Sequence, residues 1–172
     1  MTISSFNSAT RRRPICAFTL VEIMVVVVLI GLLAAMSLPT YRHITMRSKA
    51  TALENDLRAF STAFLTYNLQ NGRWPADAAP QVIPPEVANA LPVAFTQKSP
   101  IGGVYKWNYD VPADGVNAKA AIVVMSVTGN LVSDDIAQLE MIDKQMDDGD
   151  LYASSGHIQI GSTNSLVFII EK

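Results

Sequence analysis

A long apolar segment constrains what this chain can become. From Ile23 to Tyr41 the sequence runs for nineteen residues without a charged side chain. At about 1.5 Å per residue, a helix of this length covers roughly the 30 Å hydrocarbon core of a bilayer. Three arginines, Arg11 to Arg13, precede the segment, and positive charge favours the cytoplasmic side of a membrane. The sequence therefore predicts a single helix that lies in membrane lipid, with its N-terminus in the cytoplasm.

The residues before this segment do not fit an ordinary secretory signal. A signal peptide is cut after its apolar region, behind a pair of small residues, whereas here the small residue Ala17 precedes the apolar region. Cys16 also precedes it, which is the wrong order for a lipoprotein signal. Length and charge alone leave an uncleaved membrane anchor as the simplest interpretation.

The sequence Ala-Phe-Thr-Leu-Val-Glu at 17–22, between a basic leader and a long apolar helix, resembles the processing signal of type IV prepilins and type II secretion pseudopilins. In that family a prepilin peptidase cuts before a Phe, the new amino terminus is methylated, and a Glu four residues later serves filament assembly. The resemblance implies cleavage between Ala17 and Phe18, N-methylation of Phe18, and an assembly role for Glu22 and Phe18. Pro39 also matches a common pilin position. The family usually has Gly before the cut, and Ala17 departs from that pattern while remaining small.

The net charge and the cysteine content argue against a nucleic-acid partner and against a disulfide in the processed chain. The 172-residue chain has a net charge of -2, and removal of residues 1–17, with three arginines and no acid, leaves about -5. Residues 72–172 hold six basic and twelve acidic side chains. Such a segment repels phosphate backbones, so we expect no nucleic-acid partner. The only cysteine, Cys16, lies in the predicted leader, so the processed chain would have no disulfide, as in many pseudopilins and unlike many pilins.

We expect one helix from Phe18 to about Gln70, with residues 18–38 in lipid or in a filament core. Glu54, Asp56 and Arg58 fall outside an apolar stripe on its second half. The stripe alternates spacings of four and three, which is the helical pattern, at Met46, Ala50, Leu53, Leu57, Phe60, Phe64 and Tyr67. Asn71-Gly72 is a stop signal. The predicted organisation is a leader at 1–17, a helix at 18–71 and a globular head at 72–172.

Six of the nine prolines fall between Pro75 and Pro100, which predicts an irregular loop over 73–103. The loop has apolar anchors that a disordered linker would lack, namely Trp74, Val82, Ile83, Leu91 and Phe95. Its opening, Gly72-Arg73-Trp74-Pro75, resembles the αβ loop of pseudopilins.

The remainder of the head is predicted to form strands over 104–110, 119–127, 157–160 and 166–171, with a helix over 134–146 capped by Ser133. Together these elements predict the fold class α+β, with a long N-terminal helix packed on a small antiparallel sheet, and this is the pilin-like fold.

Catalytic motifs are absent from the sequence, so we do not expect an enzyme. The two histidines, His43 and His157, stand alone. One cofactor hypothesis remains, which is Ca²⁺ held by Asp147, Asp148 and Asp150, because hard oxygen ligands crowded in a turn suit this ion. The resemblance adds that some major pseudopilins hold calcium in the C-terminal part of the head. A solvated turn at a helix end is the alternative.

These features favour a structural subunit of a cell-envelope filament, first as a pseudopilin of a type II secretion system. The subunit would wait in the bacterial inner membrane, with its head in the periplasm, and then join a helical bundle of itself and related pseudopilins. A prepilin peptidase and an inner-membrane assembly platform are the implied partners. A type IV pilus or competence pilus subunit is the alternative, and a membrane-anchored periplasmic binding module or enzyme is the second.

Overall fold

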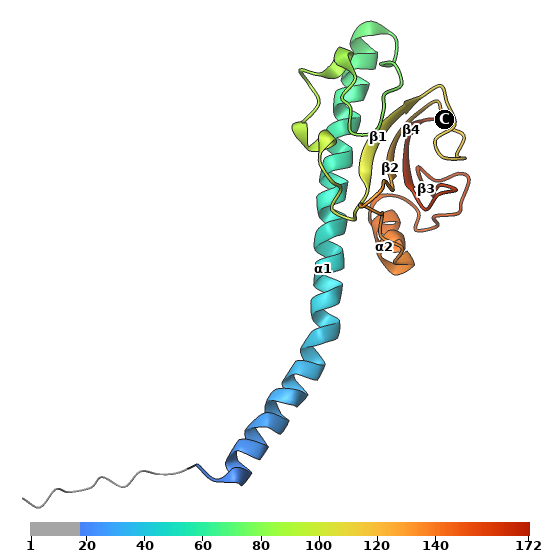
Figure 1. Ribbon diagram of the computed structural model, residues 1–172. Coiled ribbons are helices and arrows are strands. Elements are labelled where there is room, and N and C mark those ends of the chain that lie inside the picture. Colours follow the sequence, from blue (N-terminus) through green and yellow to red (C-terminus); the bar gives the residue numbers. More distant parts are fainter. Residues whose placement is uncertain (1–17) are drawn as a thin grey trace, which may run out of the picture. The chain divides into compact units, whose positions relative to one another are not determined.

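The computed structural model describes residues 18–172, which form one long helix, a second short helix and a four-stranded sheet (Figure 1). The chain divides into two compact units between Tyr41 and Arg42. The elements follow in the order α1 (Leu20–Asn71), the 3₁₀ helices η1 (Pro85–Val87) and η2 (Val93–Thr96), β1 (Val104–Tyr109), β2 (Ala120–Met125), α2 (Ile136–Met146), β3 (Ile158–Ile160) and β4 (Leu166–Glu171). The predicted α+β, pilin-like fold is confirmed.

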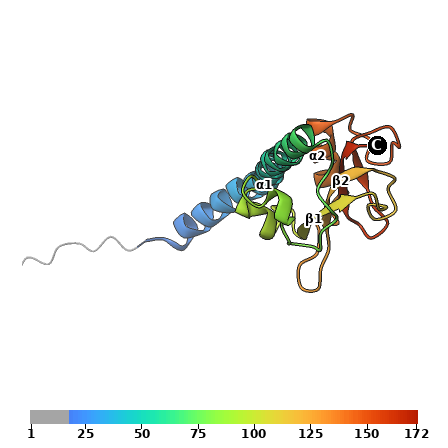
Figure 2. The same cartoon turned by 90° about the horizontal axis from the view of Figure 1, so that it is seen from above.

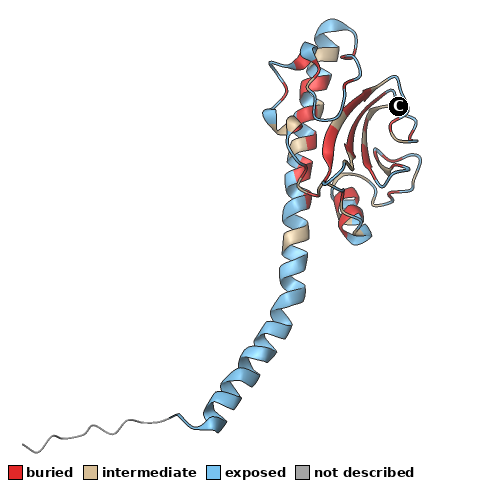
Figure 3. Cartoon of the chain, in the orientation of Figure 1, coloured by how far each residue is buried: buried red, intermediate tan, exposed pale blue. Residues whose placement is uncertain are grey.

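The first part of α1, Leu20–Tyr41, is exposed at every residue (Figure 3). Its side chains are nevertheless mostly large and apolar, and an 18-residue window of α1 reaches a mean hydropathy of 2.7. Helix α1 is therefore long and apolar enough to cross a membrane, and no residue among 18–172 covers its apolar part.

The second part of α1, residues 42–71, forms one wall of the core of the second unit (Figure 3). The predicted stripe is confirmed at its centre, where Ala50, Leu53, Leu57, Phe60 and Phe64 are buried. Its end residues, Met46 and Tyr67, are only half-buried.

The prediction that Glu54 lies outside the stripe is wrong, because this residue is only 9% exposed. Its carboxylate lies 2.6 Å from the Arg58 guanidinium and accepts a hydrogen bond of 2.8 Å from the Gln145 amide. A buried charge persists when it is paired and hydrogen-bonded, and α2 supplies the second partner.

Aromatic rings fill the space between α1 and the sheet. Phe60 packs edge-on against Phe95 and Tyr105, with ring centroids 5.2 and 4.9 Å away. Phe64 stacks on Trp107 at 3.8 Å, and the Trp107 indole N–H donates to the backbone oxygen of Pro75 at 3.1 Å. The Pro-rich loop is thus tied into the core rather than left as a linker.

The sheet is antiparallel throughout and has the strand order β1-β2-β4-β3, beside the second part of α1 (Figures 1 and 2). Strand β2 is buried on both faces. Ile122 and Val124 face the core shared with α1, whereas Ala121 and Val123 belong to a second cluster under the 111–118 loop, with Ala113 and Val116.

Two local predictions fail. Helix α2 is capped by Asp135, whose carboxylate accepts from the Ala137 N–H at 3.1 Å, whereas Ser133 accepts from the Asp135 N–H one step earlier. In the Pro-rich loop, Trp74, Leu91 and Phe95 are buried as predicted, but Val82 is 48% exposed.

Candidate assembly site and acidic cluster

Thr19 lies directly before the first residue of α1. The Glu22 N–H donates to the Thr19 backbone oxygen at 3.1 Å and to its hydroxyl at 3.3 Å, so Thr19 caps the helix. Phe18, at 75% exposure, comes directly before this cap. The spacing Thr19-x-x-Glu22 is that of a capping box, which gives Glu22 a local structural role as an alternative to assembly.

Glu22 is the only charged side chain between Phe18 and Tyr41. It is exposed, and within residues 18–172 no cation lies at ion-pairing distance from it. It is one helical turn from Phe18, about 6 Å along the axis. Its carboxylate is therefore free to meet a positive group from outside these residues. Ala17 and the rest of the predicted leader lie outside the described residues.

A second cluster of charge lies where α2 meets the following turn. Carboxylate oxygens of Asp143, Asp147 and Asp148 lie within 4.8 Å of one another. This group differs from the predicted set, because Asp143 joins it and Asp150 does not. Asp143 precedes Asp147 by four residues, so one helical turn brings them together, and that spacing was the available signal.

Asp143 is fully buried, and neither of its carboxylate oxygens has a partner in hydrogen-bonding geometry. Burial and, after it, the neighbouring carboxylates of Asp148, Asp147 and Asp150 together raise the pKa of this carboxyl to about 6, against the opposing effect of the nearby Gly149 N–H. A buried polar group without a partner is rare in folded proteins, which points to a group that completes it.

The other acids in this turn already accept backbone hydrogen bonds. One Asp147 oxygen accepts from the N–H groups of His157 and Ile158, which joins the end of α2 to β3. Asp148 accepts from the Asp150 N–H at 2.9 Å, and Asp150 accepts from the Tyr152 N–H at 3.1 Å. The turn is therefore ordered by its own carboxylates, and it holds Asp147 and Asp148 beside Asp143.

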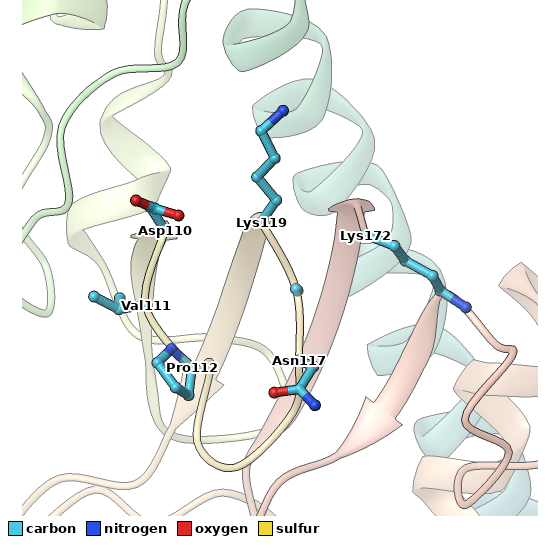
Figure 4. Close-up of a pocket in the computed structure, with 7 residues that line it drawn as sticks. Asp110, Val111, Pro112, Asn117, Lys119 and Lys172 are labelled. Carbon is cyan, nitrogen blue, oxygen red and sulfur yellow. The ribbon is translucent and has the colours of Figure 1, made fainter.

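A cavity of about 310 Å³ at the loop after β1 contains no catalytic group (Figure 4). Its lysines, Lys119 and Lys172, point away from each other. Lys119 lies 2.6 Å from the Glu171 carboxylate, and Lys172 donates to the backbone oxygens of Ser154 and Ser155. Glu171 also accepts from the Trp74 indole at 2.5 Å, and the hydrogen bonds from Lys119 and Trp74 hold its pKa below the ordinary value. Both lysines therefore hold parts of the fold together, and neither points to a catalytic role.

Comparison with known proteins singles out the N-terminal region. Residues 12–38 match the family described as the prokaryotic N-terminal methylation motif, a range that includes Ala17, Phe18 and Glu22. The chain is similar to the type II secretion system core protein G of Pseudomonas aeruginosa, with 39% identity over 66 residues, which are 38% of this chain and 46% of that protein.

Type IV pilins are similar to the chain at nearly the same sequence identity. The type IV major pilin PilE1 of Neisseria gonorrhoeae is 36% identical over 58 residues, or 34% of this chain and 35% of that protein. PilA of Myxococcus xanthus is 35% identical over 74 residues, or 43% of this chain and 31% of that protein. The chain spans less than half the length of the curated relatives it matches.

The chain therefore carries the N-terminal methylation motif, and its homologues are type IV pilins and a type II secretion core protein. Its long helix packed on an antiparallel sheet is the pilin-like α+β fold.

Proposed function

We propose that the protein is a filament subunit whose segment Leu20–Tyr41 forms the filament core after cleavage between Ala17 and Phe18. The observation that carries the proposal is this apolar segment, exposed at every residue directly after a methylation motif. An apolar helix without cover in its own chain requires lipid or other helices around it. The segment is surrounded by lipid first, in the inner membrane with the head in the periplasm. It is surrounded by other helices afterwards, in a helical bundle of identical or related subunits.

The orientation in the membrane rests on the motif rather than on charge. Arg42, Arg47 and Lys49 follow the apolar segment and equal Arg11 to Arg13 in number. The positive-inside rule therefore gives no net direction once the cations on both sides are counted, which corrects the argument for a cytoplasmic N-terminus from Arg11 to Arg13 alone.

In this proposal Glu22 sets the axial register of the bundle. A carboxylate costs about 2.5–3.5 kcal/mol at the centre of a bilayer on insertion scales. A dry bundle also disfavours an unpaired carboxylate. No Lys or Arg lies between Arg13 and Arg42, so the available cation after cleavage is the amino terminus of Phe18. Pairing Glu22 of one subunit with Phe18 of the next gives a head-to-tail contact, and such contacts build filaments when they do not close.

Among filament systems we propose a type II secretion pseudopilus. Three features support this choice: the Gly72-Arg73-Trp74-Pro75 opening of the loop, the lack of cysteine after Cys16, and the similarity to a type II secretion core protein. Similarity to PilE1 and PilA keeps a type IV or competence pilus as the second candidate. Deletion of the gene should abolish export of secreted enzymes and leave surface pili and DNA uptake intact. Loss of pili with normal export would assign the subunit to the second candidate.

Processing is tested by the intact mass of the protein extracted from membranes. We expect a chain that begins at methylated Phe18, because the small Ala17 admits the peptidase. Ala17→Gly is the matched control and should be processed at least as fast. A chain that retains Arg11 to Arg13 in cells with an active prepilin peptidase would contradict the proposal.

As a second role we propose that Asp143, Asp147 and Asp148 bind Ca²⁺, with water completing the shell. The buried, unpartnered carboxylate of Asp143 supports this, since Ca²⁺ takes oxygen ligands and neutralises crowded acids. At a concentration about 100 times the dissociation constant, the ion would stabilise the fold by about 2.7 kcal/mol. Calcium should then raise the melting temperature relative to chelator.

Asp143→Asn separates binding from folding. This substitution should abolish the calcium shift without lowering the melting temperature in chelator, because it removes an uncompensated buried charge. Asp134→Asn, an exposed acid before α2, should keep the shift. Equal melting curves of the parent protein in calcium and in chelator would dispose of this role.

A further inference from the structure

The stretch of α1 after the apolar segment is basic and has no acidic neighbour in sequence. No Asp or Glu occurs between Glu22 and Glu54. Within that interval Arg42, His43, Arg47 and Lys49 are all exposed. In the part of the chain that the structure describes, none of the four has a carboxylate at ion-pairing distance. Their charge is therefore available to a partner outside this chain.

Helix α2 brings a further cation to the same place. A cavity of about 400 Å³ is lined from α1 by His43 and Arg47 and from α2 by Met141, Lys144 and Gln145. Lys144 is exposed and, within residues 18–172, has no ion pair. The Gln145 amide is held by Glu54 and Thr51, at 2.8 and 3.3 Å. Cations that lie about a hundred residues apart in sequence thus border one hollow.

The lining of this cavity suits a phosphate group. A guanidinium presents a fork of N–H donors that matches phosphate oxygens, and a lysine ammonium adds a point charge. Imidazole N–H groups are further donors. The half-buried Met141 supplies an apolar wall beside them, so the cavity fits a phosphate that is attached to an apolar body.

The position along α1 indicates which phosphate. Arg47 is six residues past Tyr41 in the same helix, or about 9 Å of helical rise. The polar region of a bilayer extends roughly 5–8 Å beyond each side of the hydrocarbon core. Arg42 and His43 would therefore lie at the depth of the lipid headgroups when the segment before them spans the membrane. Arg47 would lie at the outer edge of this region, which its long side chain can reach.

We propose that this basic cavity binds the phosphate of an anionic phospholipid, such as phosphatidylglycerol, while the subunit waits in the membrane. The inference rests on the membrane-anchored stage of the proposed function. It gives the head of the waiting subunit a fixed contact with the membrane surface, which extraction into the filament must break.

The test counts the lipids that remain bound to the full-length protein. The protein is exchanged into mild detergent with equal amounts of phosphatidylglycerol and phosphatidylcholine, and native mass spectrometry measures each lipid per chain. We expect phosphatidylglycerol to be preferred. Each cation near an anionic surface contributes about fivefold in affinity, so Arg47→Gln with Lys144→Gln should reduce the preference at least about fivefold.

The matched control removes equal charge elsewhere, through Arg73→Gln with Lys98→Gln, two exposed cations of the head. This control should retain the preference. An unchanged preference in the Arg47 and Lys144 variant overturns the inference, and so does complete displacement of the lipid by excess inorganic phosphate, which would indicate a free-anion site. If the parent protein showed no preference between the two lipids and the Arg47 and Lys144 variant formed no filaments, the cavity would instead bind an acidic surface of a neighbouring subunit. That result would also overturn the inference. The same spectra report cleavage before Phe18, so failure here is separable from failure of the proposed function.

Discussion

The two parts of α1 differ completely in where their apolar side chains go. Leu20–Tyr41 is rich in Val, Leu and Ile on every side and buries none of them. Residues 42–71 are polar on most sides, and they bury a stripe against the sheet. The two parts of this helix therefore require different surroundings. The stripe packs against the sheet of the same chain, whereas the part that is apolar on every side needs lipid or other subunits around it.

This difference indicates that the stability of the head and the proposed assembly of subunits depend on different residues of the same helix. A substitution in the stripe should change folding of the residues around it, whereas a substitution in Leu20–Tyr41 should change contacts with lipid or neighbouring subunits. The following predictions test whether the two parts are as separate as the burial pattern indicates.

The largest effect on folding is expected at Phe60. This ring is fully buried and contacts both Phe95 and Tyr105, so Phe60→Ala should cost about 3–5 kcal/mol. The measurement is denaturant unfolding of residues 42–172, the compact second unit, which we expect to be soluble and folded. Leu69→Ala, at an 87% exposed position of the same helix, is the control and should cost less than about 0.5 kcal/mol. Equal stability of the parent and Phe60→Ala would show that the stripe packs elsewhere.

A smaller effect is expected at Tyr105, whose hydroxyl donates to the Asp56 carboxylate at 2.7 Å. Burial, and then the hydrogen bond to Asp56, hold the pKa of Tyr105 well above its ordinary value, so the hydroxyl remains a donor at neutral pH. Tyr105→Phe keeps the ring packing and removes only this charge-assisted bond, which should cost about 1.5–3 kcal/mol. Tyr152→Phe, 70% exposed, is the control, and a loss of the same size in both variants would show that the Asp56 bond contributes nothing.

The smallest effect on folding is expected at Val27, which is 61% exposed in the first part of α1. Val27→Ala should shift unfolding of the head by less than about 0.5 kcal/mol, because the residue contributes no contact to its core. The unfolding is followed by fluorescence of the two buried tryptophans, Trp74 and Trp107, in the full-length protein in detergent. A loss comparable to that of Phe60→Ala would break the separation between the two parts of the helix.

The sequence was sufficient for the elements that repeat a regular pattern. The spacings of four and three placed Leu53, Leu57 and Phe60 on one face, and all three are buried. Runs of β-branched residues predicted the strands, of which β4 extends over the predicted residues, while the others are shorter at their ends.

What the sequence did not reveal depends on partners from distant elements. Glu54 is buried because Gln145 of α2 reaches it, and no local pattern encodes that contact. Asp143 lies on the helix while the predicted calcium ligands lie in the turn, so a search for crowded acids in the turn omitted it. The basic cavity was missed for the same reason, because Lys144 is far from Arg47 in sequence.

The central claim is that the exposed apolar part of α1 is an intersubunit surface whose register is set by the charge of Glu22. The most direct measurement is the yield of filaments sheared from cells that express Glu22→Val or Glu22→Gln as the sole copy, with processing followed by intact mass. Glu22→Gln keeps the Thr19-x-x-Gln spacing of a capping box and removes only the charge. We expect both variants to be inserted and cleaved before Phe18 but to form no filaments. Normal filaments from Glu22→Gln would contradict the account and leave this residue with a capping role alone.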